Sequence, residues 1–256
     1  MATANVQAEP KLRTRYDHVF FQAFAVLIAV VVFVGFAQTY YLPGYLSGVL
    51  TLPAWKQGLV PPHPWIVHIH AVLFSSWIGI LLLQTSLVSA RRVDLHRRLG
   101  VGTIALAGLM LLVGFAVSCE SLARNFAPAD PKLGFAATNV LPLLVFSALV
   151  YFAYRERFTP AAHKRLMMVG TIQLLPAAIV RLPVPGIAGS PPTPEICCYS
   201  LLLLMAGYDL WTMLNVHRAT LSGLIGLGLP FNDIIFQGTW WRDFAMWMQT
   251  IGYSLR

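Results

Sequence analysis

Three histidines recur at matching places in the chain, each at the start of an apolar run and each followed by basic residues. His96 opens the segment His-Arg-Arg-Leu, His163 opens His-Lys-Arg-Leu, and His217 is followed by Arg218 and then by Leu221. Imidazole nitrogens bind zinc and iron readily, including haem iron. Three imidazoles at the same depth in a helical protein could therefore form a metal site.

One carboxylate accompanies these histidines. Asp209 is the only carboxylate well inside a confidently apolar segment, and ionisable groups inside a membrane are candidates for function. A carboxylate can complete the coordination shell of a metal or orient a ligating imidazole. The sequence thus predicts a site of His96, His163, His217 and Asp209 that holds iron, haem b or zinc.

The basic neighbours of the histidines support a competing interpretation. Arg97, Arg98, Lys164 and Arg165 would repel a bound cation unless their side chains point away from it. They would suit an anionic substrate or an anionic lipid head group. In that interpretation the histidines lie beside phospholipid head groups, and Asp209 pairs with a nearby arginine.

The composition indicates which elements must position these residues. Of 256 residues, 57% are hydrophobic and 11% are charged, whereas about a quarter of a soluble domain is charged. The net charge of +8 is spread in short clusters between apolar runs, so nucleic-acid binding is not expected. These features predict an all-α fold, a polytopic transmembrane helical bundle in a lipid bilayer.

A bilayer core about 30 Å thick requires about 20 apolar residues per helix. Six segments meet this requirement: 19–42, 65–90, 99–118, 135–154, 166–182 and 196–214. A seventh, 221–236, is short and is interrupted by Pro230, Asn232 and Asp233. We expect a cytoplasmic tail at 1–18, a single bundle at 19–236 and an amphipathic, interfacial segment at 237–256.

Lys and Arg are concentrated in the flanks that lie on the same side as the N-terminus. The positive-inside rule therefore predicts a cytoplasmic N-terminus, and we expect the protein in the bacterial inner (cytoplasmic) membrane. On the outer side, His68 and His70 are further candidate ligands. They are about 200° apart on a helix and cannot share one metal, and a haem there would have only one well-buried histidine.

Several polar residues inside the predicted spans need hydrogen-bond partners. Ser75 and Gln84 follow His70 on one helix, and Asn139, Thr171 and Gln173 could supply the partners. The three cysteines fall at the outer ends of spans, where Cys119 could form a disulfide with Cys197 or Cys198. Three buried free thiols are the alternative.

Several stretches resemble those of an uncharacterised family of small bacterial polytopic membrane proteins. The matching pieces are His70-Ala71-Val72-Leu73-Phe74-Ser75, Leu95 to Gly100, His163 to Met167, Tyr208-Asp209-Leu210 and His217 to Leu221. This resemblance implies a six-to-seven-helix bundle with no assigned activity. A looser similarity to seven-helix zinc hydrolases lacks their Ser-before-His order, and a similarity to b-type cytochromes lacks their full set of histidines.

Two functions therefore remain open from the sequence. The first is a membrane metalloprotein, either an oxidoreductase with iron or haem or a hydrolase with zinc-activated water. The second is a non-enzymatic membrane transport or assembly protein that binds anionic lipid or a membrane-protein partner.

Overall fold

The computed structural model describes residues 16–43, 63–128, 130, 132–184, 193–228 and 239–256, which contain helices and no strand. In chain order the elements are α1 (Asp17–Phe36), η2 (Ala37–Tyr41), α4 (Trp65–Ser89), α5 (Val93–Asn125), α6 (Leu133–Ala136), η3 (Ala137–Asn139), α7 (Val140–Arg155), α8 (Pro160–Ile172), α9 (Pro176–Ile179), α10 (Thr193–Met213), α11 (Arg218–Gly228) and α13 (Thr239–Ser254).

Four of these helical segments are long and apolar enough to cross a membrane: Asp17–Tyr41, Trp65–Ser89, Val93–Asn125 and Thr193–Met213. Most of their apolar surface faces outward, as at Val101 and Leu112, which are 68% and 67% exposed. In water such a surface would aggregate, whereas lipid covers it at no cost. The all-helical prediction is confirmed, and the fold is that of a helical membrane protein.

The other predicted spans differ from single long helices. Segment 135–154 is divided among α6, η3 and α7, and segment 166–182 is interrupted at 173–175, between α8 and α9. Proline causes the second interruption, because Pro176 has no N–H to donate to Ile172. The Leu175 N–H donates to that carbonyl instead, at 3.1 Å. Of the predicted seventh segment, α11 is described and residues 229–236 lie outside the described part.

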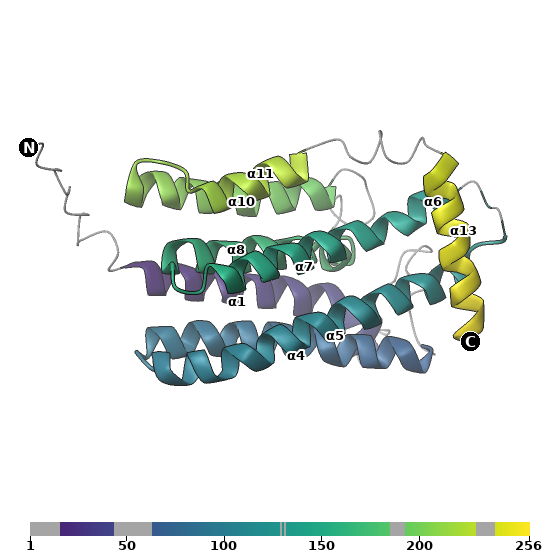
Figure 1. The fold of residues 1–256 in the computed structure, drawn as a ribbon, viewed down its shortest axis with the longest axis horizontal. Helices are drawn as coiled ribbons and strands as arrows, with labels where there is room; N and C mark the ends of the chain where they lie inside the picture. The colour runs from purple at the N-terminus through teal and green to yellow at the C-terminus, as the bar shows by residue number, and fades with distance from the viewer. Residues whose placement is uncertain (1–15, 44–62, 129, 131, 185–192, 229–238) are drawn as a thin grey trace, which may run out of the picture.

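The helices run alternately in opposite directions, so that the α4–α5, α7–α8 and α10–α11 turns lie at the same end of the bundle as the start of α1 (Figure 1). We call this the basic end, because it holds Arg91, Arg92, Arg155, Arg157 and Arg218 at these turns, all of them exposed. The three predicted histidine motifs all begin helices here. The sequence therefore located them correctly at one end.

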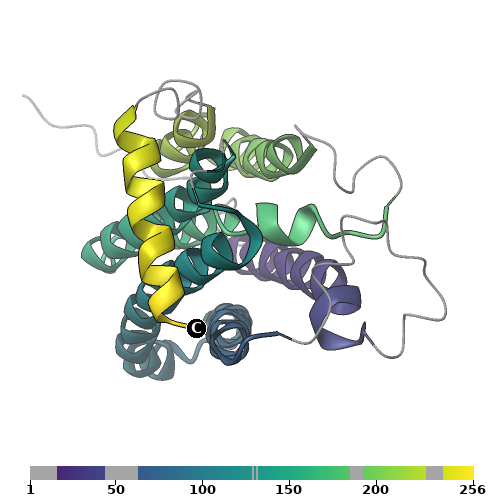
Figure 2. The same cartoon turned by 90° about the vertical axis from the view of Figure 1, so that its right-hand side faces the viewer.

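The helix α13 crosses the opposite end of the bundle at a steep angle to the other helices (Figures 1 and 2). Its indole Trp241 donates to the Gly134 carbonyl at 2.7 Å, and Gln249 donates to the Leu122 and Phe126 carbonyls. The outer face of α13 exposes Trp240 and Trp247. One face of the helix is thus packed on α5 and α6, and its aromatic residues lie on the surface.

The disulfide that the sequence allowed is not formed, and all three cysteines are free. Cys119 packs against α13 in one apolar cluster, whereas Cys198 packs with α1 and α8 in another. The segments carrying them are held apart by these separate cores, which sequence spacing did not reveal. Cys119 and Cys198 are buried, and Cys197 is half-buried.

Gly252 allows α13 to lie against the backbone of α5. A Cβ at this position would lie 2.0 Å from the Cys119 carbonyl oxygen, which backbone cannot accommodate. We expect Gly252→Ala to displace α13 and expose Cys119. In a Cys197→Ser/Cys198→Ser background, maleimide labelling of Cys119 should rise at least tenfold. Gly79→Ala is the matched control, because no atom lies within 4 Å of the added methyl, and equal labelling of both variants would contradict the packing.

Candidate functional site

The first turn of α8 contacts three neighbouring elements through three consecutive residues. His163 Nδ1 donates to the Ala153 carbonyl of α7 at 2.8 Å, Lys164 pairs with Asp17 of α1, and Arg165 pairs with Asp209 of α10. Successive helical residues are about 100° apart, so that each of the three faces a different helix. The motif that the sequence singled out is thus the point where the bundle is tied together at the basic end.

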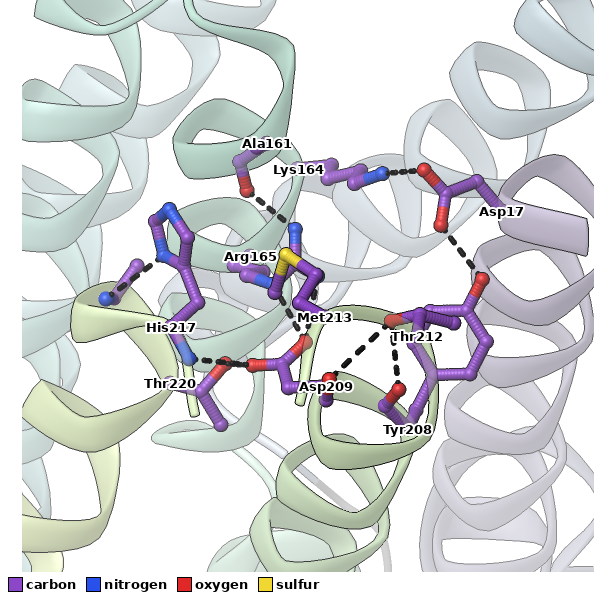
Figure 3. A network of polar contacts seen from close by, with 11 residues as sticks. Asp17, Ala161, Lys164, Arg165, Tyr208, Asp209, Thr212, Met213, His217 and Thr220 are labelled. Carbon is purple, nitrogen blue, oxygen red and sulfur yellow. Dashed lines mark hydrogen bonds and ion pairs between the residues drawn. The ribbon is translucent and has the colours of Figure 1, made fainter. Parts of the chain in front are cut away.

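Arg165 and Asp209 form a buried ion pair (Figure 3). Arg165 donates from Nε and Nη2 to the same oxygen, Asp209 Oδ1, at 2.8 and 2.6 Å, and from Nη1 to the Ala161 carbonyl at 2.8 Å. Their side chains are 2% and 1% exposed. Burial of either charge alone would be prohibitive, and the pair neutralises both.

The second carboxylate oxygen of Asp209 accepts hydrogen bonds from the start of α11. Asp209 Oδ2 accepts from the backbone N–H of His217 at 3.1 Å and from the Thr220 hydroxyl at 2.6 Å. His217 in turn uses Nδ1 to accept from the Ala219 N–H at 3.1 Å, as an N-terminal helix cap does (Figure 3). Both oxygens of Asp209 and the lone pair of His217 are therefore already in use.

A second set of polar contacts, which the sequence analysis missed, joins α1 to this site. Lys164 pairs with Asp17, and the Tyr208 hydroxyl donates to the other oxygen of Asp17 at 2.6 Å. The Tyr208 ring stacks on Phe20 with centroids 3.7 Å apart. The sequence analysis placed Asp17 in the predicted tail at 1–18 and so gave it no contact with the bundle. Its position directly before a strongly apolar run was the feature of the sequence that could have indicated one.

His96 and His163 meet although α5 and α8 are far apart in the chain. Their ring centroids are 6.1 Å apart and the rings are nearly perpendicular, at 85°. Because a carbonyl only accepts, His163 carries its proton on Nδ1 and keeps its Nε2 lone pair free. His96 Nδ1 is buried and has no hydrogen-bond partner in the part of the chain that the structure describes.

The structure thus brings together part of the predicted metal set. Within the described ranges, no three His, Cys, Asp or Glu side chains are grouped so as to hold a metal ion. His96 and His163 face each other, but Asp209 is occupied by Arg165, Thr220 and the His217 backbone, and His217 caps α11. Of the four residues, the structure brings His96 and His163 together, and it pairs Asp209 with Arg165, as the competing interpretation of the sequence expects.

The predicted outer-side and interior residues have other partners than expected. His68 Nδ1 bonds the Tyr40 hydroxyl at 3.0 Å, and Ser75 bonds Tyr41 at 2.7 Å. Gln84 donates to Thr103 at 3.5 Å and lines a cavity of about 20 Å³. Its Oε1 has no hydrogen-bond partner among the described residues. Within the described ranges, His70 Nδ1 and Gln173 Nε2 are also buried without a hydrogen-bond partner. Asn139 is exposed at the end of η3.

No family model, curated protein or solved structure matches this chain.

The Arg165–Asp209 pair should behave as a single unit in folding. Arg165→Met or Asp209→Leu leaves one buried charge unpaired, which costs about 3–5 kcal/mol. The double variant removes both charges, so we expect its loss to be clearly smaller than the sum of the two single losses. Thermal unfolding in detergent measures this. Arg92→Met is the control, since the Arg92–Asp94 pair is 64% and 65% exposed, and additive losses in the double variant would contradict a coupled pair.

His217 should make stability depend on pH. Burial, and next the charge of Arg165, lower the pKa of His217 below its ordinary value of 6.5. His217 therefore binds a proton more readily in the unfolded chain than in the folded one. Its contribution to the free energy of unfolding is complete above about pH 6.5 and is lost as the pH falls below that value. His217→Asn keeps a capping group that does not titrate. Its unfolding midpoint should fall less than that of the wild type between pH 7.5 and 5.5; identical slopes would show that His217 does not contribute.

Proposed function

We propose that this chain is a multi-pass protein of the bacterial cytoplasmic membrane, with its N-terminus and basic end in the cytoplasm, that carries a metal between His96 and His163. The concentration of exposed arginines at one end supports this orientation through the positive-inside rule. The family resemblance of the His-Lys-Arg and Tyr-Asp-Leu segments is part of the same proposal. It suggests a shared architecture and brings no activity with it.

The observation that carries the metal proposal is the distance between the two rings. A bond from a metal to an imidazole nitrogen is about 2 Å long, and the ring centroid lies roughly 1 Å beyond the nitrogen. His96 and His163 would each hold the metal through one ring nitrogen, and their ring centroids lie 6.1 Å apart with the rings nearly perpendicular. The His163 Nδ1–H bond to a backbone carbonyl is also the usual support of a ligating histidine.

Haem iron suits this pair better than zinc. Haem iron would need only two ligands from the protein, which His96 and His163 would supply, whereas structural and catalytic zinc sites use three or four protein ligands. The repulsion expected from neighbouring cations is also reduced. Lys164 and Arg165 are each paired with an aspartate, and Arg97 and Arg98 are exposed at the rim, where anionic propionates could bind them. Redox chemistry is thus favoured over hydrolysis.

Metal content and the visible spectrum of the protein test this proposal. We expect protein purified without chelator or nickel resin to contain near-stoichiometric iron and a Soret band. His96→Ala and His163→Ala should each lose both, while His18→Ala, which removes an exposed histidine of α1, should retain them. His217→Asn should also retain the metal if the pair alone binds it, whereas loss would restore the three-histidine prediction.

A second candidate function rests on the basic end itself. Exposed arginines at all three turns could hold anionic lipid head groups or a membrane-protein partner without any metal. The same preparations distinguish the two functions. Folded wild-type protein with no metal above background would overturn the metal proposal, and enrichment of anionic phospholipid in its lipid extract would favour a transport or assembly role.

A further inference from the structure

Two helices depart from regular geometry where they meet in the half of the bundle away from the basic end. The helix α1 ends in the π-helical turn η2, and α8 is interrupted at 173–175. The end of α1 contacts α9, because a Cβ at Gly35 would lie 2.3 Å from the Ala178 carbonyl oxygen. Single π turns and interrupted membrane helices occur often at ligand sites.

The helix α4 completes this junction. Its Ser75 bonds Tyr41 of η2 at 2.7 Å, and its Trp77 donates to Thr171 of α8 at 3.2 Å. Arg181, which follows α9, lies 5.1 Å from the centre of the Phe36 ring and interacts electrostatically with His70. The three segments η2, α4 and the α8–α9 interruption therefore belong to one set of contacting elements.

Each of the three segments contributes a buried polar atom that has no hydrogen-bond partner among the residues that the structure describes. These atoms are Thr39 Oγ1, His70 Nδ1 and Gln173 Nε2. Thr39 is 2% exposed and Gln173 is 5% exposed. An unsatisfied buried polar group destabilises a protein, and proteins keep few of them without a reason. Three in one junction indicate a common cause.

The chemistry of these groups defines what they could bind. The Gln173 amide nitrogen and the Arg181 guanidinium can only donate hydrogen bonds, and the Thr39 hydroxyl and His70 imidazole can donate as well. A ligand that satisfies all of them must present acceptor oxygens. Because lipid surrounds these helices, the ligand must also be soluble in the bilayer.

We propose that this junction binds the acceptor oxygen of a small amphiphile that enters from the membrane, either a quinone carbonyl or a fatty-acid carboxylate. The ligand oxygens accept hydrogen bonds from Gln173, Thr39 and His70, and the positive charge of Arg181 strengthens the binding. The site is separate from the His96–His163 pair, so that its test does not depend on the metal.

The test measures the unfolding midpoint of full-length detergent-purified protein with decylubiquinone and, separately, with oleate. A saturating probe should raise the wild-type midpoint by roughly 5 °C. Thr39→Val and Gln173→Leu should lose most of this shift. Without a probe, the midpoints of these variants should equal or exceed that of the wild type, because each variant removes an unsatisfied polar group.

Thr85→Val is the matched control, since the Thr85 hydroxyl already donates to the Leu81 carbonyl of its own helix; it should keep the full shift. A shift with decylubiquinone alone supports the site and names a quinone, and a shift with oleate alone supports it and names a carboxylate. The proposal is overturned if neither probe shifts the wild-type midpoint, or if both variants show the same shift as the wild type. It is also overturned if the variants are much less stable than the wild type without a probe.

Discussion

A charge buried among membrane helices must be neutralised by a neighbouring group, and Arg165 and Asp209 neutralise each other. The hydrogen bonds that Asp209 accepts use both of its carboxylate oxygens. Arg165 neutralises one carboxylate oxygen, and the other oxygen holds the start of α11 through His217 and Thr220. The pair therefore sets the relative positions of α8, α10 and α11 together. Such a pair need not stabilise the fold more than apolar residues would, but it strongly disfavours any packing that separates its partners.

The repeated motif shows how one sequence pattern serves two environments. In the first copy, Arg97 and Arg98 are exposed at the rim of the bundle. In the second copy, Lys164 reaches Asp17 and Arg165 is buried against Asp209. The difference arises because the start of α8 packs against α1, α7, α10 and α11, whereas Arg97 and Arg98 of α5 project from the packed helices. The histidines retain their equivalence, since both turn inward and face each other.

The two ends of the bundle offer different chemistry. The basic end combines saturated ion pairs with two imidazoles, one with a free lone pair and one with an unpartnered buried nitrogen. The other end collects donors without partners beside interrupted helices. In a medium without water, an unpaired donor is retained where something else satisfies it.

Composition and the spacing of apolar runs determined the helical membrane architecture, because the bilayer imposes one length and one hydrogen-bonding solution on every span. The charge clusters and the histidine repeat likewise located the basic end. Only the tertiary structure decided the contacts between helices, because these depend on which face of each helix packs against which neighbour. A helix that is apolar on all sides gives no indication in its sequence of which face that is. For this reason the sequence leaves Asp209 open between a metal ligand and the partner of a nearby arginine, and it places Asp17 in the predicted tail. Their arginine and lysine partners, distant in the chain, are neighbours only after folding.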